Sequence, residues 1–161
     1  MPPGGDWKVP MQHFDSDYAE RLCARIQAIP VDKVPAWGKM RRPDLVRHLI
    51  WALKHALGRS TAVPDCSTWF TRRILKHLLL HGWLRIPRNM QLPEQLVRQG
   101  IQMMEPGDLE TLQALMEEYL RRIQDDDLVP YPHPLFGKLD IDEWDRLHVL
   151  HFEHHLRQFK A

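Results

Sequence analysis

Hydrophobic residues recur three and four positions apart in several stretches of this chain, which is the period of an amphipathic helix. The first stretch covers residues 17–29, where Asp17 and Glu20 have the spacing of a capping box. The second begins at Pro43, a residue typical of the first helical position, and closes at Gly58, which suits a helix end. Each pattern predicts a helix with one apolar face.

Three more helices are predicted further along the chain. Residues 69–81 form a broadly apolar third stretch, and a clear apolar seam follows the N-cap residue Asp108 as far as position 123. Asp140 and Glu143 form another capping box, so the last helix should run from about residue 141 to 159. These periods predict that helices carry the core.

The connection over residues 83–107 contains three prolines and two glycines, which predicts an irregular crossover with one short turn around PEQLVRQG. No stretch of useful length alternates as a β-strand would. We therefore predict an all-α fold, a four-helix bundle with this long crossover between the third and fourth helices. All 161 residues fit a single domain, with residues 1–12 as a flexible or loosely packed N-terminal segment.

The overall charge favours neither a nucleic-acid partner nor an anionic membrane, because 22 Lys and Arg oppose 21 Asp and Glu. Basic side chains concentrate in residues 72–88 and acidic ones in residues 105–127, and we expect these stretches to face one another or water. Two cysteines without metal-type spacing suit reduced thiols. With no signal peptide and no membrane-length apolar run, we expect a cytoplasmic protein.

Four of the ten histidines fall in HVLHFEHHLRQF, residues 148–159. On a helical wheel, His148, His151 and His155 lie on one flank of the apolar side, whereas His154 lies nearer the polar face. His151 and His155 are one turn apart, so both imidazoles can reach one metal ion. This spacing alone is weak support, because a histidine on a helix flank is often only a hydrogen-bonded core residue.

A third ligand would have to come from another helix. His48 and His55 are seven residues apart on one face of the second predicted helix, at the margin of its apolar arc. His133 precedes a proline and is expected to organise the loop over the mouth of such a site. The remaining histidines are expected at the surface or at helix ends: His13, His77 and His81.

Several segments together resemble a bacterial family of unknown function within the DinB/YfiT-like superfamily of metal-binding four-helix bundles. The resemblance spans most of the chain and rests on WGKM (37–40), PDLVRHL (43–49), HPLFGKL (133–139) and HFEHHLRQF (151–159). It implies a DinB-like bundle and one divalent ion held by His48, His151 and His155, with His148 and His55 as second-tier positions. The chain departs from the pattern at Arg42, where a Ser-type cap is expected.

The resemblance implies a divalent-metal-binding protein, for which we expect zinc or nickel. As an enzyme it would be a metal-dependent thiol transferase or hydrolase acting on a small molecule or a low-molecular-weight thiol. The alternative is a non-catalytic metal- or small-ligand-binding stress-type protein. A third interpretation is an interaction module, in which the apolar segment 69–84 is either core or a homodimer face. No general base is identified, because Glu153 falls on the polar face of the wheel.

Overall fold

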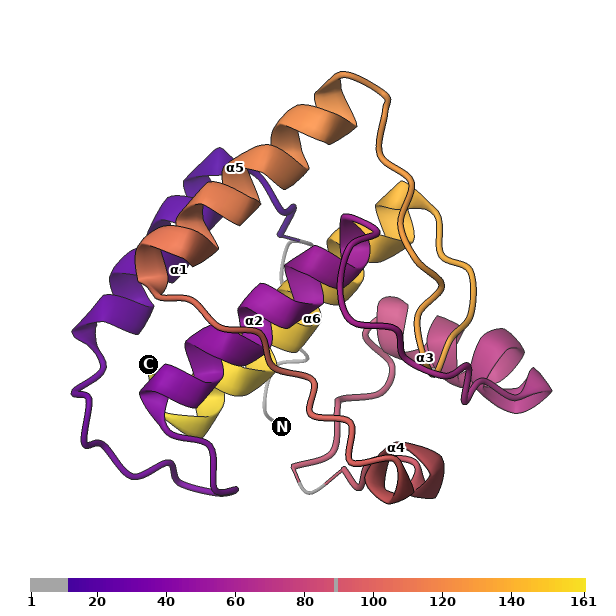
Figure 1. Ribbon diagram of the computed structural model, residues 1–161, viewed down its shortest axis with the longest axis horizontal. Helices are drawn as coiled ribbons and strands as arrows, with labels where there is room; N and C mark the ends of the chain where they lie inside the picture. The colour runs from indigo at the N-terminus through magenta and orange to yellow at the C-terminus, as the bar shows by residue number, and fades with distance from the viewer. Residues whose placement is uncertain (1–11, 89) are drawn as a thin grey trace, which may run out of the picture.

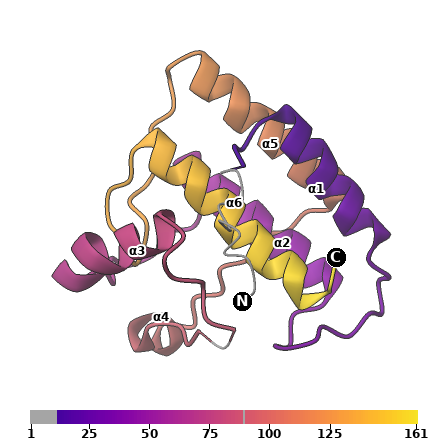
Figure 2. The same ribbon diagram turned by 180° about the vertical axis from the view of Figure 1, so that it is seen from behind.

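The computed structural model describes residues 12–88 and 90–161, and within these ranges the chain is helical and has no β-strand. Four helices of 13 to 18 residues dominate: α1 (Ser16–Ala28), α2 (Arg42–Ala56), α5 (Leu109–Gln124) and α6 (Ile141–Gln158). Their axes are roughly aligned, and α5 lies beside α1 and α2 beside α6, each pair antiparallel (Figures 1 and 2). No described helix is long and apolar enough to cross a membrane.

Three short elements lie between α2 and α5: η1 (Thr71–Leu75), α3 (Lys76–Leu80) and α4 (Glu94–Arg98). The predicted third helix is confirmed over residues 69–80, although its centre, η1, is a π-helical turn. The predicted turn at PEQLVRQG is α4, and the rest of residues 83–107 is irregular, as expected. α3 contacts α6 and buries Leu79 and Leu80, whereas α4 lies away from the long helices in both ribbon views (Figures 1 and 2).

Two helix starts differ from the prediction. Asp15 caps α1, since its carboxylate accepts a hydrogen bond of 2.8 Å from the Tyr18 backbone N–H; the proposed cap, Asp17, lies inside the first turn instead. In that position the negative charge of Asp17 interacts favourably with the positive N-terminal end of the helix dipole. α2 begins at Arg42, because Arg41 is the N-cap and its N–H donates to the Asp44 carboxylate at 3.1 Å.

The caps predicted for the later helices are confirmed. Asp108 accepts from the Thr111 backbone N–H at 2.9 Å at the start of α5. At the start of α6, Asp140 accepts from the Glu143 N–H at 2.8 Å, and the Glu143 carboxylate accepts from the Asp140 N–H at 3.0 Å. Each capped start fixes the register in which a helix presents its apolar face.

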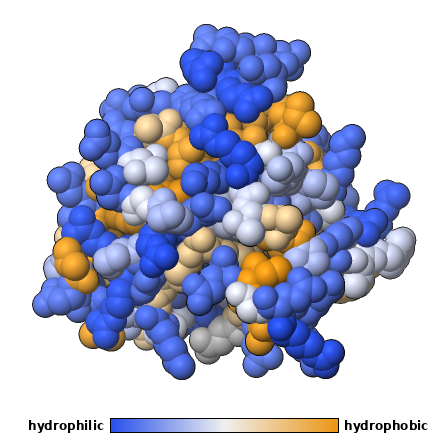
Figure 3. Space-filling view, viewed as in Figure 1, coloured by the Kyte–Doolittle hydropathy of each residue, from blue (hydrophilic) through white to orange (hydrophobic). Residues whose placement is uncertain are grey.

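The central helix is α2, which packs against α5 and α6. Ten of its 15 residues are buried, because neighbouring parts of the chain cover most of the helix and leave its charged side chains towards solvent. His48 and His55, predicted at the margin of the apolar arc of this helix, are both buried. Apolar side chains also reach the surface in several separate places on the face shown in Figure 3. The predicted loose segment 1–12 falls, but for its last residue, outside the described residues.

Candidate metal centre

Three histidines from two helices meet at their ring nitrogens. His48 Nε2 on α2 lies 2.9 Å from His151 Nε2 on α6, and His155 Nε2, one turn further along α6, lies 3.0 Å from the same atom. The ring centroids form a nearly equilateral triangle with sides of 4.7 to 4.9 Å. We call His48, His151 and His155 the histidine centre.

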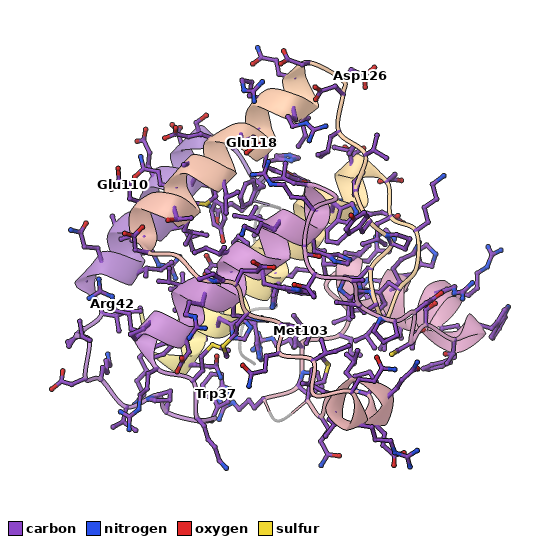
Figure 4. The ribbon with its side chains drawn as sticks, in the orientation of Figure 1. Trp37, Arg42, Met103, Glu110, Glu118 and Asp126 are labelled. Atoms are coloured by element: carbon purple, nitrogen blue, oxygen red, sulfur yellow. The ribbon has the colours of Figure 1, made fainter. Side chains whose placement is uncertain are left out.

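Neighbouring groups fix the protons on two of these rings. His48 Nδ1 lies 2.7 Å from the backbone carbonyl oxygen of Met103, which can only accept, so Nδ1 carries the hydrogen and Nε2 holds a lone pair. Figure 4 places Met103 beside α2. His155 Nδ1 donates in the same way to Gln158 Oε1 at 2.6 Å, so its Nε2 lone pair also faces His151.

The Gln158 amide is itself oriented by the link between α1 and α2. Its Nε2 donates to the Trp37 backbone carbonyl at 3.4 Å, which turns Oε1 towards His155. Gly38, with φ of +77°, allows this approach, because a Cβ there would lie 2.9 Å from Gln158 Nε2. Trp37 lies by the C-terminal end of α6 (Figure 4). The WGKM segment thus braces the last turn of α6.

A cation fits this arrangement better than hydrogen bonding among the rings does. A single N–H at His151 Nε2 cannot donate equally to the lone pairs of His48 Nε2 and His155 Nε2. A cation, by contrast, can accept one lone pair from each of the three Nε2 atoms. Nitrogens bound at ~2.0–2.1 Å to one ion, at angles of about 90° to 109°, lie roughly 2.8–3.4 Å apart. The two observed separations fall in that range. The three histidines could therefore hold a metal ion.

Burial keeps the centre uncharged at neutral pH. Desolvation, with the neighbouring His155 second, lowers the pKa of His48 to about 3. Desolvation and the facing His155 and His48 hold the pKa of His151 well below its ordinary value, and burial also lowers the pKa of His155. Neutral imidazole is the form that binds metal, so protons compete little for these nitrogens at pH 7.

The two second-tier histidines lie outside the histidine centre. His55 bonds through Nδ1 to Ser60 Oγ and through Nε2 to the Pro132 carbonyl, both at 2.8 Å. His148 is 1% exposed and packs against Trp144, Tyr119 and other aromatic rings. Two turns of α2 separate His55 from His48, which explains why they share a face without sharing a site.

His133 organises its own loop, whereas the expectation that this loop covers the mouth of the site stays a prediction. Its Nδ1 accepts from the backbone N–H groups of Leu135 and Phe136, at 3.1 and 3.2 Å. The histidines expected at the surface or at helix ends are indeed exposed: His13, His77 and His81. We call His55, His133 and His148 the packed histidines.

The helical wheel misplaces His154. It is 8% exposed rather than near a polar face, because the link between α1 and α2 returns over α6, with the Trp37 ring 6.2 Å from the His154 ring. Glu153 is excluded as a base, as expected, since it accepts from Arg25 at 2.7 Å and from the Tyr18 hydroxyl at 3.1 Å.

Sequence reasoning missed the groups that orient the rings of the histidine centre. Gln158 follows His155 by three residues, a spacing at which helical side chains meet, so it could have been found. Met103 could not, because its backbone carbonyl reaches His48 through the irregular crossover, 55 residues away in sequence. The contribution of the Trp37 carbonyl likewise depends on how a loop crosses α6.

Residues 47–161 match the family described as "Protein of unknown function (DUF1569)". The match covers well over half of the chain, which therefore belongs to this family. The matched region includes all three residues of the histidine centre. No curated protein and no solved structure shows a significant match to the chain.

Proposed function

We propose that this protein binds one divalent metal ion through His48, His151 and His155, in the bundle arrangement of the DinB/YfiT-like superfamily. The observation that carries the proposal is the convergence of three Nε2 atoms, two of them with lone pairs fixed by backbone or amide partners. Imidazole ligands suit zinc, nickel, iron and copper, and we propose zinc or nickel.

The ligand set favours an open site over a structural one. Three neutral imidazoles leave the ion its full charge and at least one free coordination position, the pattern of catalytic zinc sites. When bound, such an ion lowers the pKa of a coordinated water to about 7 or deprotonates a coordinated thiol. The protein's own residues hold the ligands: Met103 and Gln158 keep the Nδ1 protons in place.

We propose that His48, His151 and His155 would hold the ion where it could activate a low-molecular-weight thiol or water, for transfer to or hydrolysis of a small molecule. The alternative is a binding protein without turnover, which the same geometry would serve. The second candidate is supported by the position of Glu153, which is paired with Arg25 and offers the centre no base.

Cobalt(II)-loaded protein tests the open position. A small thiol such as 2-mercaptoethanol should add a thiolate-to-cobalt absorption band, because the free position accepts sulfur. His155→Ala should abolish the band, whereas His13→Ala, which changes an exposed histidine, should leave it. If the cobalt absorption spectrum does not change when thiol is added, the proposal of an open coordination position is contradicted. Turnover of an electrophilic substrate by zinc-loaded protein with thiol then separates the enzyme from the binding protein.

A further inference from the structure

A cavity of about 290 Å³ lies on the flank of α6 beside the histidine centre. Its charged walls come from two elements: Arg85 and Arg88 from the crossover and Arg157 from α6. The uncharged lining consists of Trp37, Ile86, Pro87 and His154. We call these seven residues the arginine cavity. Its volume is near the lower end of the range for small-molecule sites.

Among the described residues, no carboxylate forms an ion pair with the three arginines of this cavity. Within residues 12–88 and 90–161, the ion pairs closer than 4.0 Å involve other arginines, such as Arg25, Arg59 and Arg122. No acidic residue lines the cavity. A second cavity of the same volume, between α1 and α5, is lined by Glu20, Glu117 and Arg121 among others. The excess of positive charge thus distinguishes the arginine cavity from this second cavity.

One of these guanidinium groups is already held in place. The Arg88 Cζ atom lies 4.7 Å from the centroid of the Trp37 ring, so the cation stacks on the indole. Stacking uses the face of a guanidinium and leaves its N–H edge free to bind an oxyanion through two parallel bonds. Arg157 follows His154 by three residues on the same side of α6 and supplies a second cation.

The cavity and the histidine centre share structural parts. Trp37 lines the cavity with its ring, and its carbonyl holds the Gln158 amide that orients His155. His154 also lines the cavity, and its ring lies 5.3 Å from that of His155. A molecule in the cavity would therefore contact His154, whose ring neighbours that of His155, one residue of the histidine centre.

We propose that the arginine cavity binds a small organic anion, through a phosphate or carboxylate group held by Arg85, Arg88 and Arg157. The Trp37 indole and the Ile86 and Pro87 side chains provide apolar surface for the remainder of the molecule. That this anion is the substrate rests on the proposed metal centre; the anion site itself does not.

Calorimetric titration of the full chain with phenyl phosphate and with phthalate, at low and high salt, tests the proposal. Both probes carry an oxyanion on a planar ring. The probe that binds more tightly shows whether the cavity prefers phosphate or carboxylate. Arg157→Gln and Arg88→Gln should each weaken binding about tenfold or more, since each removes a charged hydrogen bond. Arg98→Gln is the control, because Arg98 is an exposed arginine paired with Glu94 outside the cavity.

The metal state separates this proposal from the proposed function. We expect chelator-treated protein and His155→Ala to retain anion binding, which would establish the site even if no metal binds. Binding that is lost with the metal but retained in Arg157→Gln would show that the anion binds the ion itself and would overturn the proposal. Equal weakening by Arg98→Gln, or no binding at millimolar probe, would overturn it as well.

Discussion

The histidine centre and the packed histidines differ in what their ring nitrogens face. In the centre, Nδ1 of His48 and of His155 bonds outward to an acceptor, and the Nε2 atoms turn towards one another. Among the packed histidines, His55 forms hydrogen bonds through both ring nitrogens, to Ser60 Oγ and to the Pro132 carbonyl. His133 uses Nδ1 to hold backbone N–H groups of its own loop.

The difference shows that burial and clustering do not by themselves make a histidine a ligand. The pKa of His148 and that of His133 are each lowered to about 3, chiefly by desolvation, just as the pKa of His48 is. All three rings are therefore neutral at pH 7. What distinguishes His48 is an acceptor behind the ring and another imidazole in front of it.

The largest expected effect follows removal of a ligand. His155→Ala should weaken zinc binding by about a hundredfold or more, because two imidazoles hold the ion less well than three. His154→Ala changes the neighbouring residue without touching the centre and should cost less than about tenfold. Competition with a coloured zinc chelator measures both. Equal losses, or a larger loss at His154, would show that the facing nitrogens are not the ligands.

A smaller effect is expected when the ligand-orienting amide is removed. Gln158→Ala should weaken zinc binding by about 10- to 100-fold, because His155 Nδ1 loses the acceptor that fixes its proton. Gln124→Ala, at the end of α5, is the matched control and should leave affinity unchanged. If Gln158→Ala binds zinc as tightly as the parent protein, the orienting role assigned to this amide is wrong.

The packed histidines should make the free energy of unfolding depend on pH. His148 has a pKa of about 3 in the folded protein and about 6.5 when unfolded, so its contribution to stability is complete above pH 6.5 and is lost as pH falls towards 3. Between pH 7 and pH 5 the free energy of unfolding should fall by about 2 kcal/mol from this residue.

His148→Phe tests that contribution, because it keeps an aromatic ring and removes the titration. The buried His148 Nε2 has no hydrogen-bond partner among the described residues, so the substitution removes no bond at that nitrogen. Urea unfolding of metal-free protein at pH 7 and pH 5 should show a shallower pH dependence in the variant. Identical slopes for the two proteins would contradict the buried neutral state of His148.

The smallest expected effect is that of metal removal on the fold. The chain buries a core large enough to fold without a metal, with caps at its long helices, so chelation should leave the helical circular dichroism nearly unchanged. Added zinc should raise the unfolding temperature only through ligand linkage. Collapse of the helical signal on chelation would instead make the ion a structural clip.

Much of the helical pattern is readable from local sequence. Asp108 and Asp140 cap helices where predicted, because an N-cap acts within three residues of itself. At the start of α1 the local pattern is misleading, because Asp17 and Glu20 have the spacing of a capping box but Asp15, two residues earlier, is the residue that caps the helix. Such competition between nearby acidic residues is settled by which apolar face the core requires.

The candidate site likewise has features that follow from local sequence and features that depend on tertiary packing. His151 and His155 share a helix, so their proximity follows from the helical repeat, whereas their meeting with His48 depends on how α2 packs against α6. The helical wheel misplaces His154, because a wheel describes an isolated helix and the loop that carries Trp37 packs against the His154 ring. Residues that act through loops, such as Met103, lie beyond any local pattern.

The most direct test of the central claim is the metal content of untagged protein. After incubation with excess zinc and gel filtration, the parent chain should retain about one ion, and His151→Ala, which removes the nitrogen shared by both close contacts, should retain almost none. His133→Ala should retain the ion, because that ring serves its own loop. Parent protein that emerges without zinc, or a His151→Ala variant that keeps a full equivalent, would contradict the three-histidine centre.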